Sequence, residues 1–179
     1  LILVFSIMTL IVQRKADGAA ITVAEKNLEN EAKLMAGTLD SMFEAIKLRG
    51  DGQSQFFLKF IGGQPELGQG TVKTGDVELP VVKLGNETLN ANERVLVDFR
   101  SLTGEEAAFL LIKDGKVYRL STLLKDKDGK PMHGVPIGDN DPVAKALLAG
   151  KDYQGLAIRG GKYNFSTVKL LKDKDGKPW

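Results

Sequence analysis

The sequence predicts an α+β protein in which a long N-terminal helix is followed by an antiparallel sheet with short flanking helices. Three observations lead to this prediction: an apolar stripe with helical spacing from Ala24 to Ile46, short apolar runs separated by turn residues after Val95, and an Asp-Pro helix start at Asp141. A chain of 179 residues, 42% of them hydrophobic and 27% charged, is long enough for one domain with its own core.

The first twelve residues, "LILVFSIMTLIV", carry no charge and predict an apolar helix. At about 1.5 Å per residue this helix is roughly 18 Å long, whereas a bilayer core needs about 30 Å. We therefore expect residues 1–15 to be the outer, truncated part of a transmembrane helix, with Arg14 and Lys15 at the water interface. An ordinary buried helix is the alternative. A signal peptide fits less well, because no small-residue cleavage pattern precedes "QRK".

Residues 16–50 predict a long amphipathic helix that continues from the first segment without a break. Its apolar side chains recur at spacings of three and four residues, which places them on one face. They are Ala24, Leu28, Ala32, Met35, Leu39, Met42 and Ile46. The sequence "RGDG" is expected to end the helix, because Gly50 or Gly52 can take the left-handed cap conformation. So narrow an apolar seam also predicts a contact between two copies of the helix in a homodimer.

Residues 51–179 are expected to form the folded domain. Its beginning, residues 53–92, is rich in glycine and turn formers, with short apolar pieces such as "FFLKFI" and "LPVVKL". Strand-length apolar runs follow, "RVLVDF", "AAFLLIK" and "KVYRLSTLL", and the turn pair Asp114 and Gly115 joins the last two.

A short helix and another pair of strands complete this domain. Asp141 followed by Pro142 predicts an N-cap with proline at the first helical position, and Gly150 offers the stop. The runs "YQGLAIR" and "KYNFSTVKLL" predict two further strands around a turn at Gly160 and Gly161.

The nine-residue string "LLKDKDGKP" occurs twice, at residues 123–131 and 170–178. With Gly129 at position 6 of an EF-hand loop, the string offers two carboxylates and places Leu124 at position 1. Calcium needs six or more oxygen ligands, so we expect no metal site here. Asp-Gly between apolar runs instead predicts two hairpin tips in one sheet, with the lysines keeping each tip soluble.

The composition excludes several functional classes. The chain has no cysteine and one histidine, which rules out disulfides, thiolate zinc sites, cysteine nucleophiles and multi-histidine metal centres. A net charge of +2 gives no sign of nucleic-acid binding. The sequence shows no motif for a nucleophile with its base and no phosphate-binding glycine loop, so we expect neither an enzyme nor a bound cofactor.

A series of short motifs runs from Val95 to Trp179. They are a Val-Asp (Val97, Asp98), a Thr-Gly (Thr103, Gly104), an Arg-x-Ser-Thr strand end (Arg119, Ser121, Thr122), a Gly-Lys hairpin (Gly129, Lys130), a Gly-Lys-x-Tyr-x-Gly stretch (Gly150, Lys151, Tyr153, Gly155), a tyrosine in a strand (Tyr163) and an Asp-x-x-Gly turn (Asp173 to Gly176). In this order and spacing they resemble the extracytoplasmic Cache sensor domains of bacterial methyl-accepting chemotaxis receptors and related sensor kinases.

The resemblance implies a PAS-like (Cache) antiparallel sheet behind the long helix. It also implies a domain that binds a small molecule on the periplasmic or extracellular side of the inner (cell) membrane. The sequence ends before the last strand and second transmembrane helix of such receptors. It also lacks the full set of aromatic and acidic residues found in the amino-acid-binding double Cache receptors, so we expect a small organic acid instead.

Candidate ligand-binding residues are polar and aromatic side chains of the strands and of the loop after the first repeat. They are Arg119, Ser121, Thr122, His133, Tyr153 and Tyr163. Arg119 is the expected carboxylate anchor, because a guanidinium fork gives two parallel hydrogen bonds. Alternation along the strand predicts that Ser121 lies on the same face as Arg119 and that Tyr118 lies on the opposite face. A solvent-facing arginine, core tyrosines and an exposed histidine are the structural alternatives.

A pilin-like filament or assembly subunit is the alternative function, because such subunits also join an apolar N-terminal helix to a sheet. They usually carry a glutamate near the start of the apolar run, whereas the first acidic residue here is Asp17. We therefore expect a sensor domain, homodimeric through its long helix.

Overall fold

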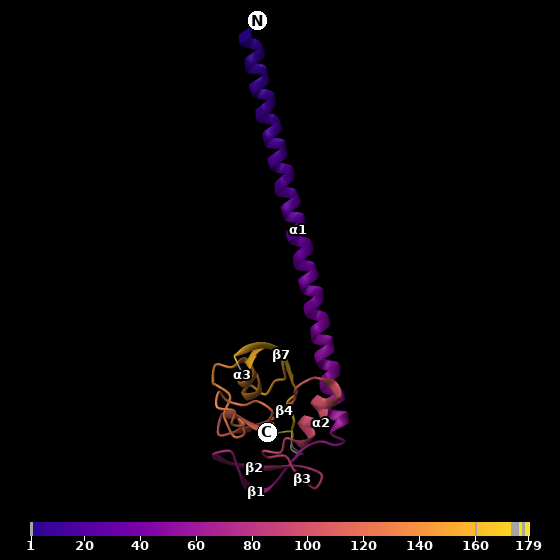
Figure 1. The fold of residues 1–179 in the computed structure, drawn as a ribbon, viewed down its shortest axis with the longest axis vertical. Helices are drawn as coiled ribbons and strands as arrows, with labels where there is room; N and C mark the ends of the chain where they lie inside the picture. Colours follow the sequence, from indigo (N-terminus) through magenta and orange to yellow (C-terminus); the bar gives the residue numbers. More distant parts are fainter. Residues whose placement is uncertain (1, 160, 173–175, 177) are drawn as a thin grey trace. The chain divides into compact units, whose positions relative to one another are not determined.

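The computed structural model describes residues 2–159, 161–172, 176 and 178–179, with side chains described from Gly18 onward. The chain divides into two compact units, Leu1–Ala45 and Ile46–Trp179. Helix α1 (Ile2–Phe60) contributes to both and is unbroken in Figure 1, which confirms the expected continuous N-terminal helix. Within the part of the chain that the structure describes, no helix combines the length and the apolar character needed to cross a bilayer.

Helix α1 does not end at Gly50 or Gly52, as "RGDG" predicted, but continues to Phe60. The predicted end is wrong because the following residues carry an aromatic face into the core. The ring of Phe57 meets Phe99 edge-on with centroids 4.8 Å apart, and Phe60 meets Phe99 at 5.6 Å. Each helical glycine costs about 1 kcal/mol, whereas fully burying an aromatic ring contributes about 1.5–3 kcal/mol.

The unit Ile46–Trp179 contains seven described strands in three antiparallel sheets, with orders β1-β2-β3, β4-β5 and β6-β7. They are β1 (Glu66–Thr74), β2 (Val77–Leu84), β3 (Glu87–Thr88), β4 (Ala108–Lys113), β5 (Lys116–Thr122), β6 (Tyr153–Arg159) and β7 (Lys162–Val168). Figure 1 shows β1, β2 and β3 at one end of this unit and β7 at the other, with β4 between them. These strands and three helices confirm the α+β class.

The sequence predicted one antiparallel sheet, but the strands form three separate sheets. The second edge of β5 is occupied by the segment that follows the first repeat. Gly134 N donates to Arg119 O at 2.7 Å, Arg119 N donates to Val135 O at 3.1 Å, and Ile137 N donates to Val117 O at 2.7 Å. With this edge already paired, β6 and β7 form a separate ribbon.

The run "RVLVDF" lies in helix α2 (Arg94–Thr103) and is not a strand. Its apolar side chains suit a helix, because Leu96 and Phe99 lie about one turn apart and are both buried. Gly104 ends the helix in the left-handed conformation, with φ 74°, and its N–H donates to Arg100 O.

Helix α3 (Pro142–Leu148) forms as predicted from its Asp-Pro start. Asp141 is the N-cap, and its side chain accepts a hydrogen bond from Val143 N at 2.9 Å. The turn between β4 and β5 is also confirmed: Asp114 and Gly115 have φ values of 49° and 72°, as a type I′ turn requires.

The first copy of the repeat forms a tip, as predicted, but the tip does not belong to one of the three sheets. Lys125 and Pro131 pair in an isolated antiparallel bridge, and Gly129 has φ 79°. In the second copy Lys172 and Pro178 pair in the same way, but residues 173–175 and 177 lie outside the described residues. Residue 160 of the predicted β6–β7 turn lies outside them too.

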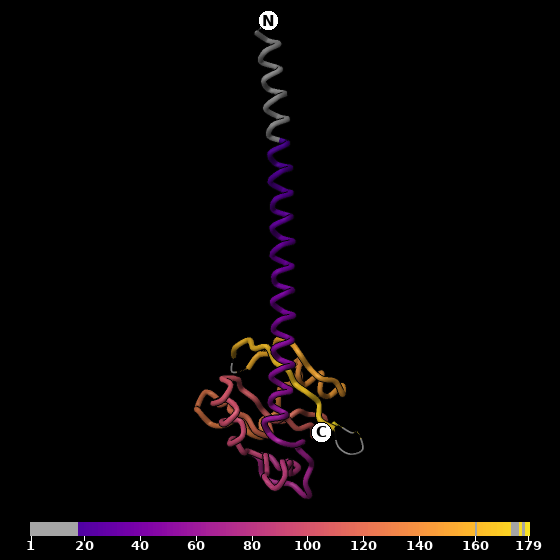
Figure 2. Tube along the Cα trace, turned by 90° about the vertical axis from the view of Figure 1, so that its right-hand side faces the viewer, coloured from indigo at the N-terminus to yellow at the C-terminus, as the bar shows by residue number. Residues whose placement is uncertain are grey.

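Two hydrophobic clusters form the core, and the β4–β5 ribbon lies between them. One face of the ribbon, with Phe109, Leu111 and Leu120, joins a cluster with β2, α2 and Trp179. The other face, with Leu110 and Val117, joins a cluster with α3 and β6. In Figure 2 the yellow segment after β7 runs down from the top of this unit, and Trp179 near the C mark is buried.

Two glycines allow the β1–β2 turn to lie directly on the segment after the first repeat. A β-carbon on Gly75 would overlap the carbonyl of His133, and one on Gly134 would overlap the carbonyl of Thr74. Both glycines also have positive φ. A side chain at either position is therefore disfavoured both by overlap with a carbonyl and by the backbone conformation.

Candidate functional site

A large cleft in the unit Ile46–Trp179 is the candidate site. Its volume is about 1050 Å³, which is the size of a roomy small-molecule pocket. One wall is the end of α1, which includes Gly50, Gln53 and Phe57. The outward face of β4 and the strand β7 with the segment after it supply the others.

Arg119 of β5 lines this cleft and is half-buried. Its Nη1 donates to the carbonyls of Val135 at 3.4 Å and Pro136 at 3.2 Å, so backbone oxygens hold the guanidinium in place. Burial lowers the pKa of Arg119 from its ordinary value, the nearby charge of Arg159 lowers it further, and Asp141 opposes both. The guanidinium of Arg119 is therefore partly shielded from water, and a further anion beside it would stabilise its charged form.

Arg159 also lines the cleft, and the sequence analysis missed it. Its Nη1 donates to Asp141 Oδ2 at 2.5 Å and its Nη2 to Asp141 Oδ1 at 3.4 Å. A signal for it exists in β6, where Gly155, Ala157 and Arg159 alternate on one face. Two small buried residues beside the arginine leave room for its long side chain.

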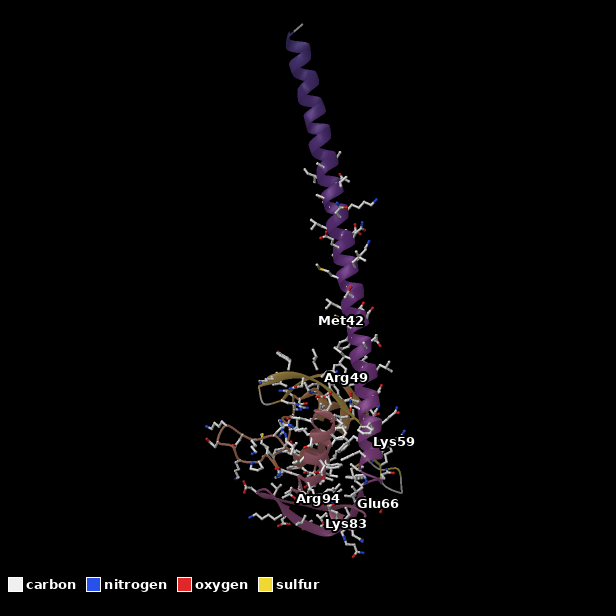
Figure 3. The ribbon with its side chains drawn as sticks, turned by 45° about the vertical axis from the view of Figure 1, so that its right-hand side comes forward. Met42, Arg49, Lys59, Glu66, Lys83 and Arg94 are labelled. Carbon is white, nitrogen blue, oxygen red and sulfur yellow. The ribbon has the colours of Figure 1, made fainter. Side chains whose placement is uncertain are left out.

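Most other charges around the cleft are neutralised by neighbours. Arg49, labelled on α1 in Figure 3, pairs with Glu105 at 2.5 Å. Lys169 Nζ lies 3.1 Å from Asp51 Oδ1 and 3.4 Å from Asp152 Oδ2. Lys162 also lines the cleft but is exposed to water. The half-buried excess of positive charge is thus at Arg119 and Arg159, and Asp141 pairs with Arg159.

The side chain of Gln53 is a second feature that the sequence analysis missed. It lines the cleft, and its Oε1 is buried without a hydrogen-bond partner among the described residues. A buried acceptor without a donor costs about 1–3 kcal/mol. Such an atom is available to accept a hydrogen bond from a bound molecule. Neither helix periodicity nor residue type distinguishes Gln53 from a surface glutamine.

Of the six predicted ligand residues, only Arg119 and Thr122 line the cleft. The prediction that Ser121 shares a face with Arg119 is wrong, because the pairing register shifts between Phe109 and Leu110. Phe109 pairs with Ser121 and Leu110 with Arg119, so the extra residue forms a bulge. Ser121 is therefore buried on the other face, and its Oγ donates to Asn92 O at 2.5 Å.

The remaining three residues lie away from the cleft lining. The side chain of His133 is largely buried, and its Nε2 lies 2.9 Å from Glu93 Oε1. Tyr153 donates from its hydroxyl to Leu156 O at 2.6 Å and packs on the second cluster. Tyr163 on β7 is 77% exposed.

The carboxylate of Asp126 in the first repeat stabilises the turn itself. Asp126 Oδ1 accepts hydrogen bonds from the backbone N–H groups of Asp128 and Lys130, each at 2.9 Å. An Asx turn of this kind uses the very oxygen that a cation would need. Among the described residues no group of three or more His, Asp or Glu side chains is placed to hold a metal ion.

Comparison with known protein families places most of the chain in a known family. The family model described as the Cache 3/Cache 2 fusion domain matches residues 13–177, which covers most of the chain. Comparisons with curated proteins and with solved structures gave no match.

Proposed function

The chain belongs to the Cache 3/Cache 2 fusion domain family, a group of ligand-sensing extracytoplasmic domains, and from this premise we propose the ligand, the receptor context and the route of the signal. The proposed ligand is a small organic acid bound in the cleft. The proposed protein is a transmembrane chemotaxis receptor or sensor kinase, in which this domain acts by binding and not by catalysis.

The two arginines of the cleft carry the proposal for an acidic ligand. Arg119 and Arg159 are both partly withdrawn from water, and Asp141 forms an ion pair with Arg159 and opposes the lowering of the pKa of Arg119. Arginine is suited to a carboxylate, because its planar fork donates two parallel hydrogen bonds. Thr122 adds a hydroxyl to the same cleft lining. Ser121, His133, Tyr153 and Tyr163, which lie elsewhere, are not part of this proposed site.

The end of α1 is the proposed route of the signal. Residues of this helix form a wall of the cleft, so a molecule that fills the cleft contacts the helix directly. A ligand shifts an equilibrium between two arrangements only by its difference in affinity for them. The proposal therefore requires that α1 take two positions with unequal contacts to the ligand.

Membrane attachment and dimerisation are further parts of the proposal. Residues 1–15 would be the outer part of a transmembrane helix, 16–50 the amphipathic segment and 51–179 the sensor domain. On the amphipathic segment Leu28, Met35, Leu39 and Met42 are more than half exposed, and Figure 3 shows Met42 on α1. These side chains form a seam for the same helix of a second copy. Sedimentation of the 179-residue chain should give a dimer that Leu28→Asp with Leu39→Asp converts to a monomer.

A thermal-shift screen with small carboxylates tests the ligand class. A ligand at one hundred times its Kd should stabilise the chain by about 2.7 kcal/mol. Arg119→Gln should abolish that shift, whereas Lys116→Gln, an equal change of charge on the exposed hairpin, should leave it intact. Indifference to all carboxylates together with a shift from a purine or an amine contradicts the proposal.

The receptor context is tested by reading the gene beyond the codon for Trp179. A second apolar span followed by a signalling module is the expected result. A stop codon within the length of one strand argues against a receptor and favours the filament-subunit alternative.

A further inference from the structure

The ion pair between Arg159 and Asp141 lies mostly out of water. The exposed fractions of the two side chains are 17% and 14%, and both guanidinium Nη atoms contact the carboxylate. A two-point contact of this kind fixes the plane of the guanidinium. Arg159 lines the cleft, whereas Asp141 is not one of the lining residues.

The position of Asp141 is itself fixed by the start of α3. Its Oδ1 accepts from Val143 N at 2.9 Å, and its backbone precedes Pro142 at the first helical position. The carboxylate of Asp141 therefore has two partners, the first turn of α3 and the guanidinium of Arg159. Because Pro142 fixes its own φ angle, the start of α3 is rigid, and the position of the Asp141 carboxylate relative to Arg159 is defined.

The walls near the arginines are apolar. Leu110, Ile112, Ile137 and Leu147 line the same cleft, and all four belong to or pack on the second hydrophobic cluster. An ionic group placed against such walls without a counter-charge is strongly disfavoured. The number of negative charges that the cleft accepts therefore follows from the number of unmatched positive charges beside it.

Building on the proposed function, we propose that Asp141 is a positioning residue that sets the charge of the ligand. It cancels one of the two guanidinium charges and holds Arg159 toward the cleft. Arg119 and Arg159 together then match one carboxylate, so the cleft takes a monoanion in preference to a dianion of similar size.

Calorimetric titration of the 179-residue chain in a mild detergent tests this, with butyrate and succinate as probes at neutral pH. The wild-type chain should bind butyrate more tightly than succinate. Asp141→Asn removes the counter-charge and should shift the ratio of the two affinities toward succinate by about tenfold. Asp141→Glu, which keeps the charge, should retain the wild-type preference. Asp139→Asn makes the same change of charge at an exposed neighbour and should leave the ratio unchanged.

A purely structural role for Asp141 would weaken both acids together and leave their ratio fixed, which would overturn the inference. A wild-type preference for succinate would overturn it as well, while leaving the proposed organic-acid sensor standing. Binding of neither acid nor of any other carboxylate would contradict the proposed function and, with it, this inference.

A measurement on the wild-type chain keeps the test independent of variant folding. Lowering the pH between the two pKa values of succinate converts the dianion to a monoanion, so its affinity should rise over that interval. A constant or falling affinity for succinate there would overturn the proposal.

Discussion

Gly50 of α1 lies so close to Thr167 of β7 that a β-carbon on residue 50 would overlap the threonine hydroxyl. Both residues also line the cleft. Gln154 reinforces the contact, because its Nε2 donates to Lys47 O at 2.8 Å and reaches Thr167 Oγ1 at 3.4 Å. The glycine thus allows the helix to rest directly on a strand in the wall of the candidate site.

We expect Gly50→Ala to destabilise the protein, because the added methyl group forces α1 away from β7. Overpacking of this kind costs about 1–3 kcal/mol in the free energy of unfolding. Gly52→Ala is the matched control, since Gly52 lies on the same helix with open space around it. That substitution should stabilise by about 0.5–1 kcal/mol through helix propensity alone.

Urea unfolding of both variants measures the difference. Adding Thr167→Ala to Gly50→Ala should recover part of the loss, because it removes the hydroxyl that the new methyl group meets. Equal stabilisation by both single substitutions would show that α1 and β7 are not in close contact.

Ser121→Ala should lower stability without changing ligand affinity. The hydroxyl of Ser121 is buried and donates to Asn92 O, so its removal leaves a carbonyl without its donor. The expected cost is about 1–3 kcal/mol in the free energy of unfolding. Carboxylate binding, measured well below the unfolding temperature, should match the wild type. A clear loss of affinity in the folded variant would instead place Ser121 at the ligand.

The tip of the first repeat should respond to turn chemistry and not to calcium. Gly129→Ala forces a side chain to φ 79° and should cost about 1 kcal/mol. Asp126→Ala removes two hydrogen bonds to backbone N–H groups and should also destabilise, whereas Asp128→Ala should be nearly neutral. Calcium titration should give no saturable signal; micromolar binding that Asp126→Ala abolishes would contradict the turn assignment.

The ion pairs of Lys169 predict a loss of stability at alkaline pH. The hydrogen bond to Asp51 raises the pKa of Lys169 above its ordinary value near 10.5, and Asp152 adds to the rise. A raised folded-state pKa contributes stability that is fully present below the unfolded-state value and is lost as the pH rises through the folded-state value. Lys169→Met should therefore be less stable than the wild type at pH 7, and the difference should shrink only above the ordinary lysine range.

The matched control for that comparison is Lys145→Met, which removes an exposed lysine of α3. Its effect on the free energy of unfolding should be small and flat across the same pH range. A flat difference for Lys169→Met as well would mean that its ion pairs contribute nothing measurable.

Local chemistry was sufficient to predict several elements of this fold. Asp114 with Gly115, and Asp141 with Pro142, act through their own backbone preferences, so the turn and the helix start could be read from neighbouring residues. The end of α1 could not be read in this way. Its extension past Gly52 depends on rings from distant parts of the chain, such as Phe99, which no local pattern includes.

The candidate site was predictable only in part, for similar reasons. Arg119 was found because residue type was sufficient: arginine is suited to a carboxylate. The inserted residue in β5 then reversed the alternation, so Thr122 lines the cleft and Ser121 does not. Arg159 could not be predicted, because its position depends on an ion pair with Asp141 at the start of another element. The buried, unpartnered oxygen of Gln53 could not be predicted either, because its burial arises from tertiary packing.

The contact between Gly75 and Gly134 has a consequence for the order of folding. The β1–β2 hairpin is built from neighbouring residues, yet its turn is seated against a segment that follows β5. Contacts between remote parts of the chain form slowly, because the intervening loop must close first. In pulsed hydrogen exchange during refolding, we expect amide protons of the β1–β2 ladder to be protected before that of Gly134, which reaches protection only when β5 is in place.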